Sequence, residues 1–129
     1  EGGSDAAARI LALPDRPTAI VCAVDMAALG VYRAAEAFGL AIGRDLSVIG
    51  YDGIPEGVHA DPPLSTFAVD NHYSGARLAT LLIRRIRGDA PETLRELASA
   101  RFLDRGSIRP PVSTDREPAP ARAPQSLTS

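Results

Sequence analysis

The chain of 129 residues contains no lysine and no tryptophan, and it has a single cysteine. All 14 basic residues are therefore arginine. A P-loop needs a lysine on the phosphates and a Schiff-base enzyme needs a lysine amine, so both classes are disfavoured. Receiver domains of the phospho-aspartate type, which carry a lysine near their acidic site, are disfavoured for the same reason. The lone Cys22 cannot form an internal disulfide, and its place in an apolar run predicts a buried thiol.

Long apolar runs are also missing. No stretch approaches the roughly 18 to 20 apolar residues that cross a bilayer, and residues 1–5 lack the features of a signal peptide. Because the chain does not begin with methionine, we allow that it is an internal piece of a longer protein. The formal charge of −2 gives no electrostatic footprint for nucleic acid, so any DNA binding by the parent would use residues outside the chain. An apolar content of 45% still suffices for the core of about one modest domain.

Apolar runs and helical stripes alternate in the first half of the chain. Residues 18–24 form a continuous β-favouring run of the kind found in a central parallel strand. Residues 26–38 follow with an apolar stripe at helical spacing, with Asp25 placed as an N-cap and Gly39 placed as a C′ glycine. Small residues in this helix would let it lie close to the sheet or to a second subunit. A second buried strand within residues 45–52 completes the pattern, which predicts an α/β fold with a right-handed strand-helix-strand unit.

A short helix, or the end of a longer one, is predicted before the first strand. Ser4 or Asp5 can cap it, and Pro14 stops it. The apolar side chains of Ala6, Ile10 and Leu13 fall on one face of this helix.

The second half of the chain predicts a longer helix and a short final strand. Asp70 or Asn71 can cap a helix that continues to Gly88, with arginines along its polar side and last turn. A last extended segment is expected within residues 94–103. Residues 112–129 lack periodicity and are rich in Pro, Ala and Ser, which predicts a disordered tail.

The sequence offers no catalytic or metal-binding pattern. No serine lies in a Gly-x-Ser-x-Gly turn, and the glycines do not make a dinucleotide-binding fingerprint. His59 and His72 are isolated from other metal ligands. We therefore expect a binding protein without a cofactor, and not an enzyme.

Two aspartates lie at the ends of predicted strands. Parallel strands end at one edge of a sheet, where ligands of open α/β sheets bind, so Asp25 and Asp52 are expected at the same edge. Asp52 lies in a tight turn between Gly50 and Gly53, and it is either a ligand contact or a plain turn aspartate. Asp25 is either a helix N-cap or a ligand contact.

Five motifs together resemble one known family. They read PTAIVCAVD at 17–25, MAALG at 26–30, DLSVIGYD at 45–52, PPLST at 62–66 and LDRGSIRPP at 103–111. In order and spacing they resemble the C-terminal half of the effector-binding core of LacI/GalR-type transcription regulators. The resemblance implies a periplasmic-binding-protein-like fold of two lobes with the ligand between them. The first half of that core, and the helix-turn-helix headpiece that reads DNA in the family, would lie outside this chain.

The resemblance also implies a division of the chain. Residues 1–64 would belong to the C-terminal lobe, and residues 65–105 would combine a hinge crossing with a helix and strand of the other lobe. Residues 106–111 would be the return crossing. Such a piece should expose apolar surface, so we expect it to aggregate or to be partly molten in isolation.

By the same resemblance, Asp52 is the cleft aspartate that bonds sugar hydroxyls, with Tyr51 beside it and Asp25 at the same edge. Val24 and Val69 stand where Asn and Gln are common in sugar-binding members. Each lost hydrogen bond removes roughly 0.5 to 1.5 kcal/mol, which favours a less hydroxyl-rich effector or a site that has decayed.

The family further implies a cytoplasmic homodimer that senses a small-molecule effector, such as a sugar, and contacts DNA only through the headpiece. No membrane contact is implied. An alternative is a secreted sugar-binding protein of a transport system, which shares the fold. The residues expected at the dimer interface, weighed against a plain core role for the first two, are Leu29, Tyr32, Ile54, Val58 and Ala60.

Overall fold

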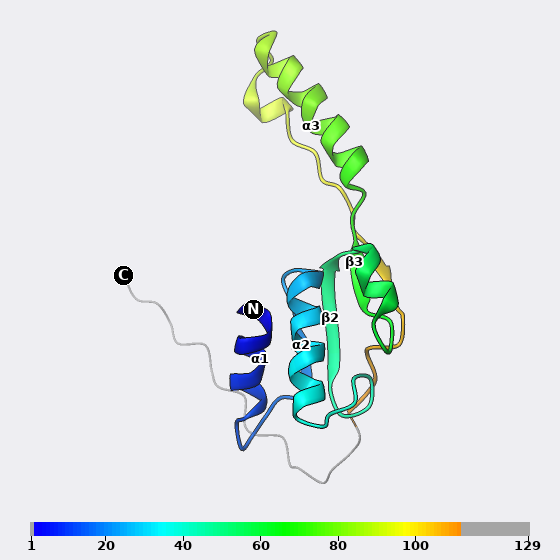
Figure 1. Cartoon of the computed structure of the whole chain (residues 1–129). Helices are drawn as coiled ribbons and strands as arrows, with labels where there is room; N and C mark the ends of the chain where they lie inside the picture. Colours follow the sequence, from blue (N-terminus) through cyan, green and yellow to red (C-terminus); the bar gives the residue numbers. More distant parts are fainter. Residues whose placement is uncertain (1, 112–129) are drawn as a thin grey trace, which may run out of the picture.

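A computed structural model describes residues 2–111 of the chain, and Figure 1 shows how they are arranged. Its elements, in chain order, are α1 (Gly2–Leu11), β1 (Ala19–Val21), α2 (Asp25–Ala37), β2 (Ser47–Asp52), η1 (Pro55–His59), β3 (Ser65–Ala68), α3 (Asn71–Ile86), η2 (Pro91–Thr93) and β4 (Arg101–Leu103). The predicted tail at 112–129 lies outside the described residues.

Four strands form one sheet in the order β1-β2-β3-β4. The first three strands are parallel, and β4 runs antiparallel to β3. Because β1 and β2 are parallel neighbours joined by α2, the predicted strand-helix-strand unit is confirmed. The last strand also falls inside the predicted segment 94–103.

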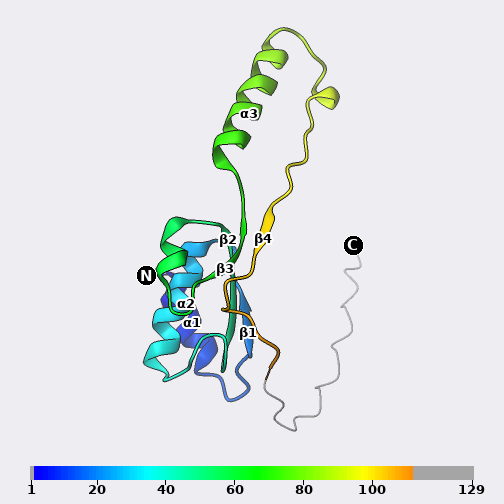
Figure 2. The same cartoon turned by 90° about the vertical axis from the view of Figure 1, so that its right-hand side faces the viewer.

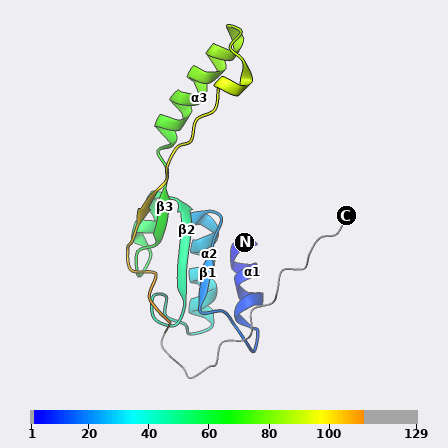
Figure 3. The same cartoon turned by 180° about the vertical axis from the view of Figure 1, so that it is seen from behind.

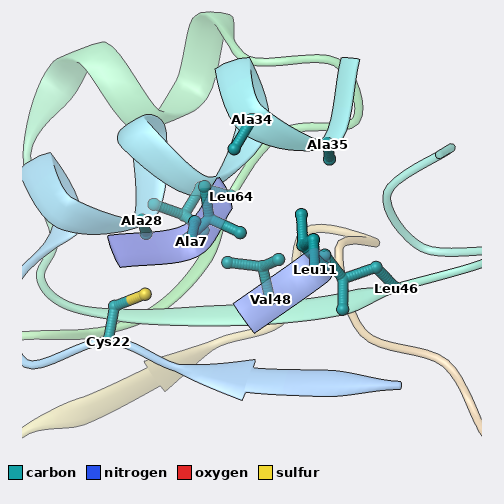
Figure 4. Packing of buried hydrophobic residues seen from close by; sticks show 10 residues of the cluster. Ala7, Leu11, Cys22, Ala28, Ala34, Ala35, Leu46, Val48 and Leu64 are labelled. Atoms are coloured by element: carbon teal, nitrogen blue, oxygen red, sulfur yellow. The ribbon is translucent and has the colours of Figure 1, made fainter. Parts of the chain in front are cut away.

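The core lies between the sheet and the helices α1 and α2. Val48, which is fully buried in β2, packs among Leu11, Leu46 and Leu64 (Figure 4). Small alanines along α2 are buried with it, so this helix approaches the sheet closely. Cys22 is also buried, as its apolar surroundings predicted.

The buried face of α1 is not its apolar stripe of Ala6, Ile10 and Leu13. Ala7 and Leu11 are buried, whereas Ile10 is 37% and Leu13 54% exposed, and Ala6 is exposed as well. A Cβ added to Gly30 would lie 2.7 Å from the backbone nitrogen of Ser4, so α1 and α2 are in backbone contact there. The close crossing selects the α1 face that carries the buried side chains, and the small residues of α2 serve this helix pair as well as the sheet.

The chain leaves this lobe after β3 and returns at β4, and the arm between them carries α3 and η2 away from the sheet (Figures 1 and 3). Asp70 caps α3 by accepting a hydrogen bond from the Tyr73 backbone N–H at 2.8 Å, as predicted. Arg77 pairs with Glu96 across the arm. The rings of Phe67 and Phe102 contact each other at a tilt, with centroids 5.2 Å apart, where the chain leaves the sheet and returns to it.

Two segments beyond the expected lobe boundary at 64/65 extend the sheet. Ser65–Ala68 and Arg101–Leu103 pair within the lobe's own sheet, because hydrogen bonding to β2 extends the sheet before the chain departs. The return segment also stays with the lobe, since the Ser107 carbonyl accepts from the Val48 N–H at 2.9 Å. The arm proper is therefore residues 69–100.

One face of the sheet carries no helix among the described residues (Figure 2). Val21 is 83% exposed on that face, and Tyr51, Phe67 and Phe102 are exposed there as well. Within residues 2–111, none of the helices is long and apolar enough to cross a membrane.

Candidate ligand-binding site

A pocket of about 580 Å³ opens where β2 and β3 end. Across the sheet, Asp52 is the register partner of Ala68, and Ala68 is the register partner of Arg101. Side chains from two parallel strand ends and from the returning strand therefore meet at one edge, as an open α/β sheet favours. The residues that line the pocket are Asp52, Gly53, Ile54, Pro55, Ala68, Val69, Asp70, Asn71, Ser99 and Arg101.

Asp52 adopts a backbone conformation that non-glycine residues rarely take. Its φ is +118°, and Gly53 follows with φ +79°. Such a conformation costs about 1–3 kcal/mol and persists only where the surrounding structure over-determines it. A Cβ on Gly53 would lie 2.5 Å from the Ala68 Cβ, so the turn is pressed against β3. Strained residues of this kind cluster at ligand-binding positions, which favours the ligand-contact interpretation of Asp52.

Asp25 is fully buried behind this turn. Its Oδ2 accepts hydrogen bonds from the backbone N–H groups of Gly53 at 2.8 Å and Ile54 at 2.9 Å. Its Oδ1 accepts from the Thr66 hydroxyl at 2.7 Å. Both oxygens are thus bonded within the chain, and the carboxylate offers no free face to a ligand in the pocket.

The predicted N-cap role of Asp25 is wrong. Val24 occupies the cap position without a side-chain cap, and Asp25 is the first residue of α2. The Asp25 carboxylate instead accepts hydrogen bonds from three groups that are distant in the sequence, two in the 53–54 turn and one in β3. It is therefore not available to cap its own helix. The strand before it is also shorter than predicted, ending at Val21 instead of residue 24.

The other predicted ligand residues divide into two groups. Asp52 and Val69 line the pocket together. Val24 is 41% exposed and Tyr51 42% exposed, and neither is among the described residues that line it. Two of the five ligand residues predicted from the sequence therefore line this pocket.

Sequence reasoning missed several pocket residues. Ser99 and Arg101 come from the returning segment, whose position depends on antiparallel pairing with β3. Asp70 was predicted only as a cap, yet it lines the pocket while also capping α3. No local sequence pattern predicts such residues, because their positions depend on how strands that are distant in the sequence pair with each other.

Two other groups near the lobe have pKa values moved by burial. Burial raises the pKa of the Cys22 thiol, and the nearby Asp25 carboxylate raises that pKa further. Burial also raises the pKa of Tyr32 to about 12. The Tyr32 hydroxyl donates to the Pro62 carbonyl at 2.9 Å, and its ring packs against the core.

The other residues of the predicted dimer surface lie in α2 and in or beside η1. Val58 is 48% exposed, whereas Leu29, Ile54 and Ala60 are partly buried. Within residues 2–111, no three His, Cys, Asp or Glu side chains lie close enough to hold a metal ion.

Comparison with known proteins identifies the family. Residues 1–108 match the periplasmic binding protein-like domain. The HTH-type transcriptional repressor CytR of Escherichia coli K12 is 37% identical over 109 residues, which cover 84% of this chain and 32% of that protein. The chain thus spans about a third of the length of this relative.

Solved structures agree with the sequence match. A LacI family regulator from Arthrobacter sp. FB24 in complex with lactose superposes with a TM-score of 0.74 at 31% identity, covering 84% of this chain and 42% of that one. The lac repressor dimer bound to operator and the anti-inducer ONPF gives a TM-score of 0.73 at 30% identity, covering 81% and 32%. These relatives are regulators, which disfavours the alternative of a secreted transport protein. The chain belongs to the LacI/GalR-type transcription regulators, and it carries part of their effector-binding, periplasmic-binding-protein-like domain.

Proposed function

We propose that the chain is the effector-sensing part of a DNA-binding transcriptional regulator. The observation that carries the proposal is Asp52, held at φ +118° on the rim of a pocket where two parallel strands end. A carboxylate fixed in this way accepts hydrogen bonds from a small ligand without reorganising. A related regulator of the same fold was crystallised with lactose, which supports a small-molecule effector.

The effector is a sugar or another small molecule that donates hydrogen bonds. Asp52, Asp70 and the Asn71 amide supply acceptors around the pocket, whereas Val69 and Ala68 supply apolar wall. A valine at position 69 cannot bond a hydroxyl, so the ligand presents an apolar edge on that side. Ser99 and Arg101 complete the wall and can donate hydrogen bonds to ligand oxygens.

Regulation follows from unequal affinity for two arrangements of the lobes. Residues 69–100 form an arm that would pack on the second lobe, with the effector between the lobes. An effector that binds the closed arrangement better shifts the population toward it and changes operator affinity through linkage. DNA contact is left to a headpiece outside this chain, and such a regulator acts in the cytoplasm.

The regulator would act as a homodimer, as in the lac repressor dimer bound to operator. The surface proposed for dimerisation combines α2 with the η1 loop, at Leu29, Tyr32, Ile54, Val58 and Ala60. Tyr32 is only half-buried, so part of its side chain could contact a partner.

The test is Asp52→Ala in the full-length regulator. Removing the carboxylate should abolish the effector response, because the ligand loses its fixed acceptor, while operator affinity in the absence of effector stays unchanged. Operator binding is measured by fluorescence anisotropy with and without the inducer that releases the wild-type protein.

The matched control is Asp5→Ala, which removes an exposed carboxylate from α1 and should leave both affinities unchanged. A normal response in the Asp52→Ala protein would refute the site. Loss of operator binding without effector would indicate a folding defect instead of a binding defect.

A further inference from the structure

We infer that Asp25 is a positioning residue that holds the Asp52 turn in its ligand-binding conformation, and that Thr66 assists it. The inference rests on the proposed effector site, since it names the side chains behind that site that set its geometry. Asp25 itself touches no ligand, because it is fully buried and bonded on both oxygens.

The contacts act on the strained position itself. The N–H groups of Gly53 and Ile54 are the two peptide donors that directly follow Asp52, and both point at Asp25 Oδ2. Hydrogen bonds to an ionised acceptor are roughly twice as strong as neutral ones. Two such bonds from consecutive peptides fix the orientation of the turn, and with it the direction of the Asp52 side chain.

The third bond ties the turn to the crossing strand. Thr66 lies in β3 and is fully buried, and its hydroxyl donates to Asp25 Oδ1 at 2.7 Å. The chain leaves the lobe three residues later, at Val69, which lines the pocket. One carboxylate therefore joins the first turn of α2, the ligand turn and the strand that leads to the arm.

Gly50 in β2 makes room for the Asp25 carboxylate, because it has no side chain. A Cβ on Gly50 would lie 2.0 Å from Asp25 Oδ1 and 3.2 Å from the Asp25 Cα, so the carboxylate would have to move. Gly50 has no positive φ, so its missing side chain serves space and not backbone conformation. The glycine at this position of β2 allows the Asp25 carboxylate to pack against the turn.

The experiment uses the full-length regulator with Asp25→Ala, Asp25→Asn and Thr66→Val. The Asn amide can still accept from both turn N–H groups through its oxygen and donate to Thr66, so it is the conservative rescue. The readouts are hydrogen exchange of the Gly53 and Ile54 amides by NMR, the φ of Asp52 in crystal structures, and lactose binding by calorimetry. The control is Ser107→Ala, because Ser107 is equally buried and bonds Ser65 and Val48 but not the turn.

Asp25→Ala should speed exchange of the two amides by about tenfold or more and release Asp52 from positive φ. Thr66→Val should give a smaller effect in the same direction, and Asp25→Asn, which keeps the bonds to the turn but not the charge, should fall between wild type and Asp25→Ala. Ser107→Ala should lower the melting temperature without changing exchange at the turn. If Asp25→Ala does not fold, Thr66→Val decides the matter alone.

Unchanged amide protection and an unchanged φ at Asp52 in Asp25→Ala, or in Thr66→Val where Asp25→Ala does not fold, would overturn the inference. Where lactose binds the wild type, its affinity should fall in parallel with the exchange effect, and an unaffected affinity would likewise overturn it. Where lactose does not bind, exchange and φ decide. An Asp52→Ala protein with a normal inducer response would refute the proposed site while leaving the conformational result intact, so the two failures are distinguishable.

Discussion

Gly50 and Asp25 illustrate how single residues set the geometry of this edge of the sheet. Neither residue is noteworthy alone, since strands tolerate occasional glycines and helices often begin with aspartate. Their meaning comes from the missing Cβ of one lying where the carboxylate of the other sits. At the scale of residues, the pocket depends on side chains that a ligand never reaches.

A double-mutant cycle tests this pairing. Gly50→Ala in the full-length protein should lower the free energy of unfolding by about 1–3 kcal/mol, because the new methyl group displaces the Asp25 carboxylate. In the Asp25→Ala background the same substitution should cost less, because the 2.0 Å contact with Oδ1 is removed, although the Cα of residue 25, at 3.2 Å, remains close. The free energies are measured by urea denaturation. Equal costs in both backgrounds would contradict the predicted steric conflict.

At the scale of elements, the packing of α1 on α2 decides which face of α1 is buried. The stripe Ala6, Ile10 and Leu13 is as regular as the face that the structure buries, so periodicity alone could not choose between them. The backbone contact at Gly30 chooses, because it fixes where the two helices cross. The helix α3, by contrast, was predicted well, since its cap and its end are local features.

The crossing can be tested with two helical glycines. Gly30→Ala should lower the free energy of unfolding by about 1–3 kcal/mol, because a Cβ there would lie 2.7 Å from the Ser4 nitrogen. Gly75→Ala in α3 meets no atom within 4 Å, so it should stabilise by about 0.5–1 kcal/mol through helix propensity. Urea denaturation of both variants checks the difference. A neutral Gly30→Ala would show that the helices do not touch as described.

At the scale of the whole molecule, the chain exposes many large apolar side chains on α3 and on the helix-free face of the sheet. Leu78, Leu82 and Ile86 follow one another at four-residue spacing on α3, and they are 66%, 61% and 76% exposed. The helix-free face of the sheet adds Val21 and Phe102 to this surface. The chain spans about a third of its CytR relative, and in the proposed two-lobe arrangement these faces would be covered by other residues.

Leu82→Ala should have different effects in the full-length regulator and in the isolated chain. In the full-length regulator it should cost about 2–5 kcal/mol of unfolding free energy, because the side chain would be buried against the second lobe. In the isolated 129-residue chain it should cost little, and it should reduce both aggregation and the fluorescence of bound ANS. Denaturation and light scattering measure the two effects. A cost of a few tenths of a kcal/mol in the full-length protein would mean that α3 does not pack on another lobe.

The sequence by itself determined the α/β class, the unit from β1 to β2, the cap and extent of α3, and the position of Asp52 at a strand end. These follow from periodicity, caps and turn residues, whose physical causes act over a few neighbouring residues. Only the tertiary structure decided that Asp25 serves the turn instead of its helix, that Ala7 and Leu11 are the buried face of α1, and that Arg101 joins the pocket. Those outcomes depend on strand register, on helix crossing and on donors more than 25 residues away in the chain, as with Asp25 and Gly53, which no local pattern encodes.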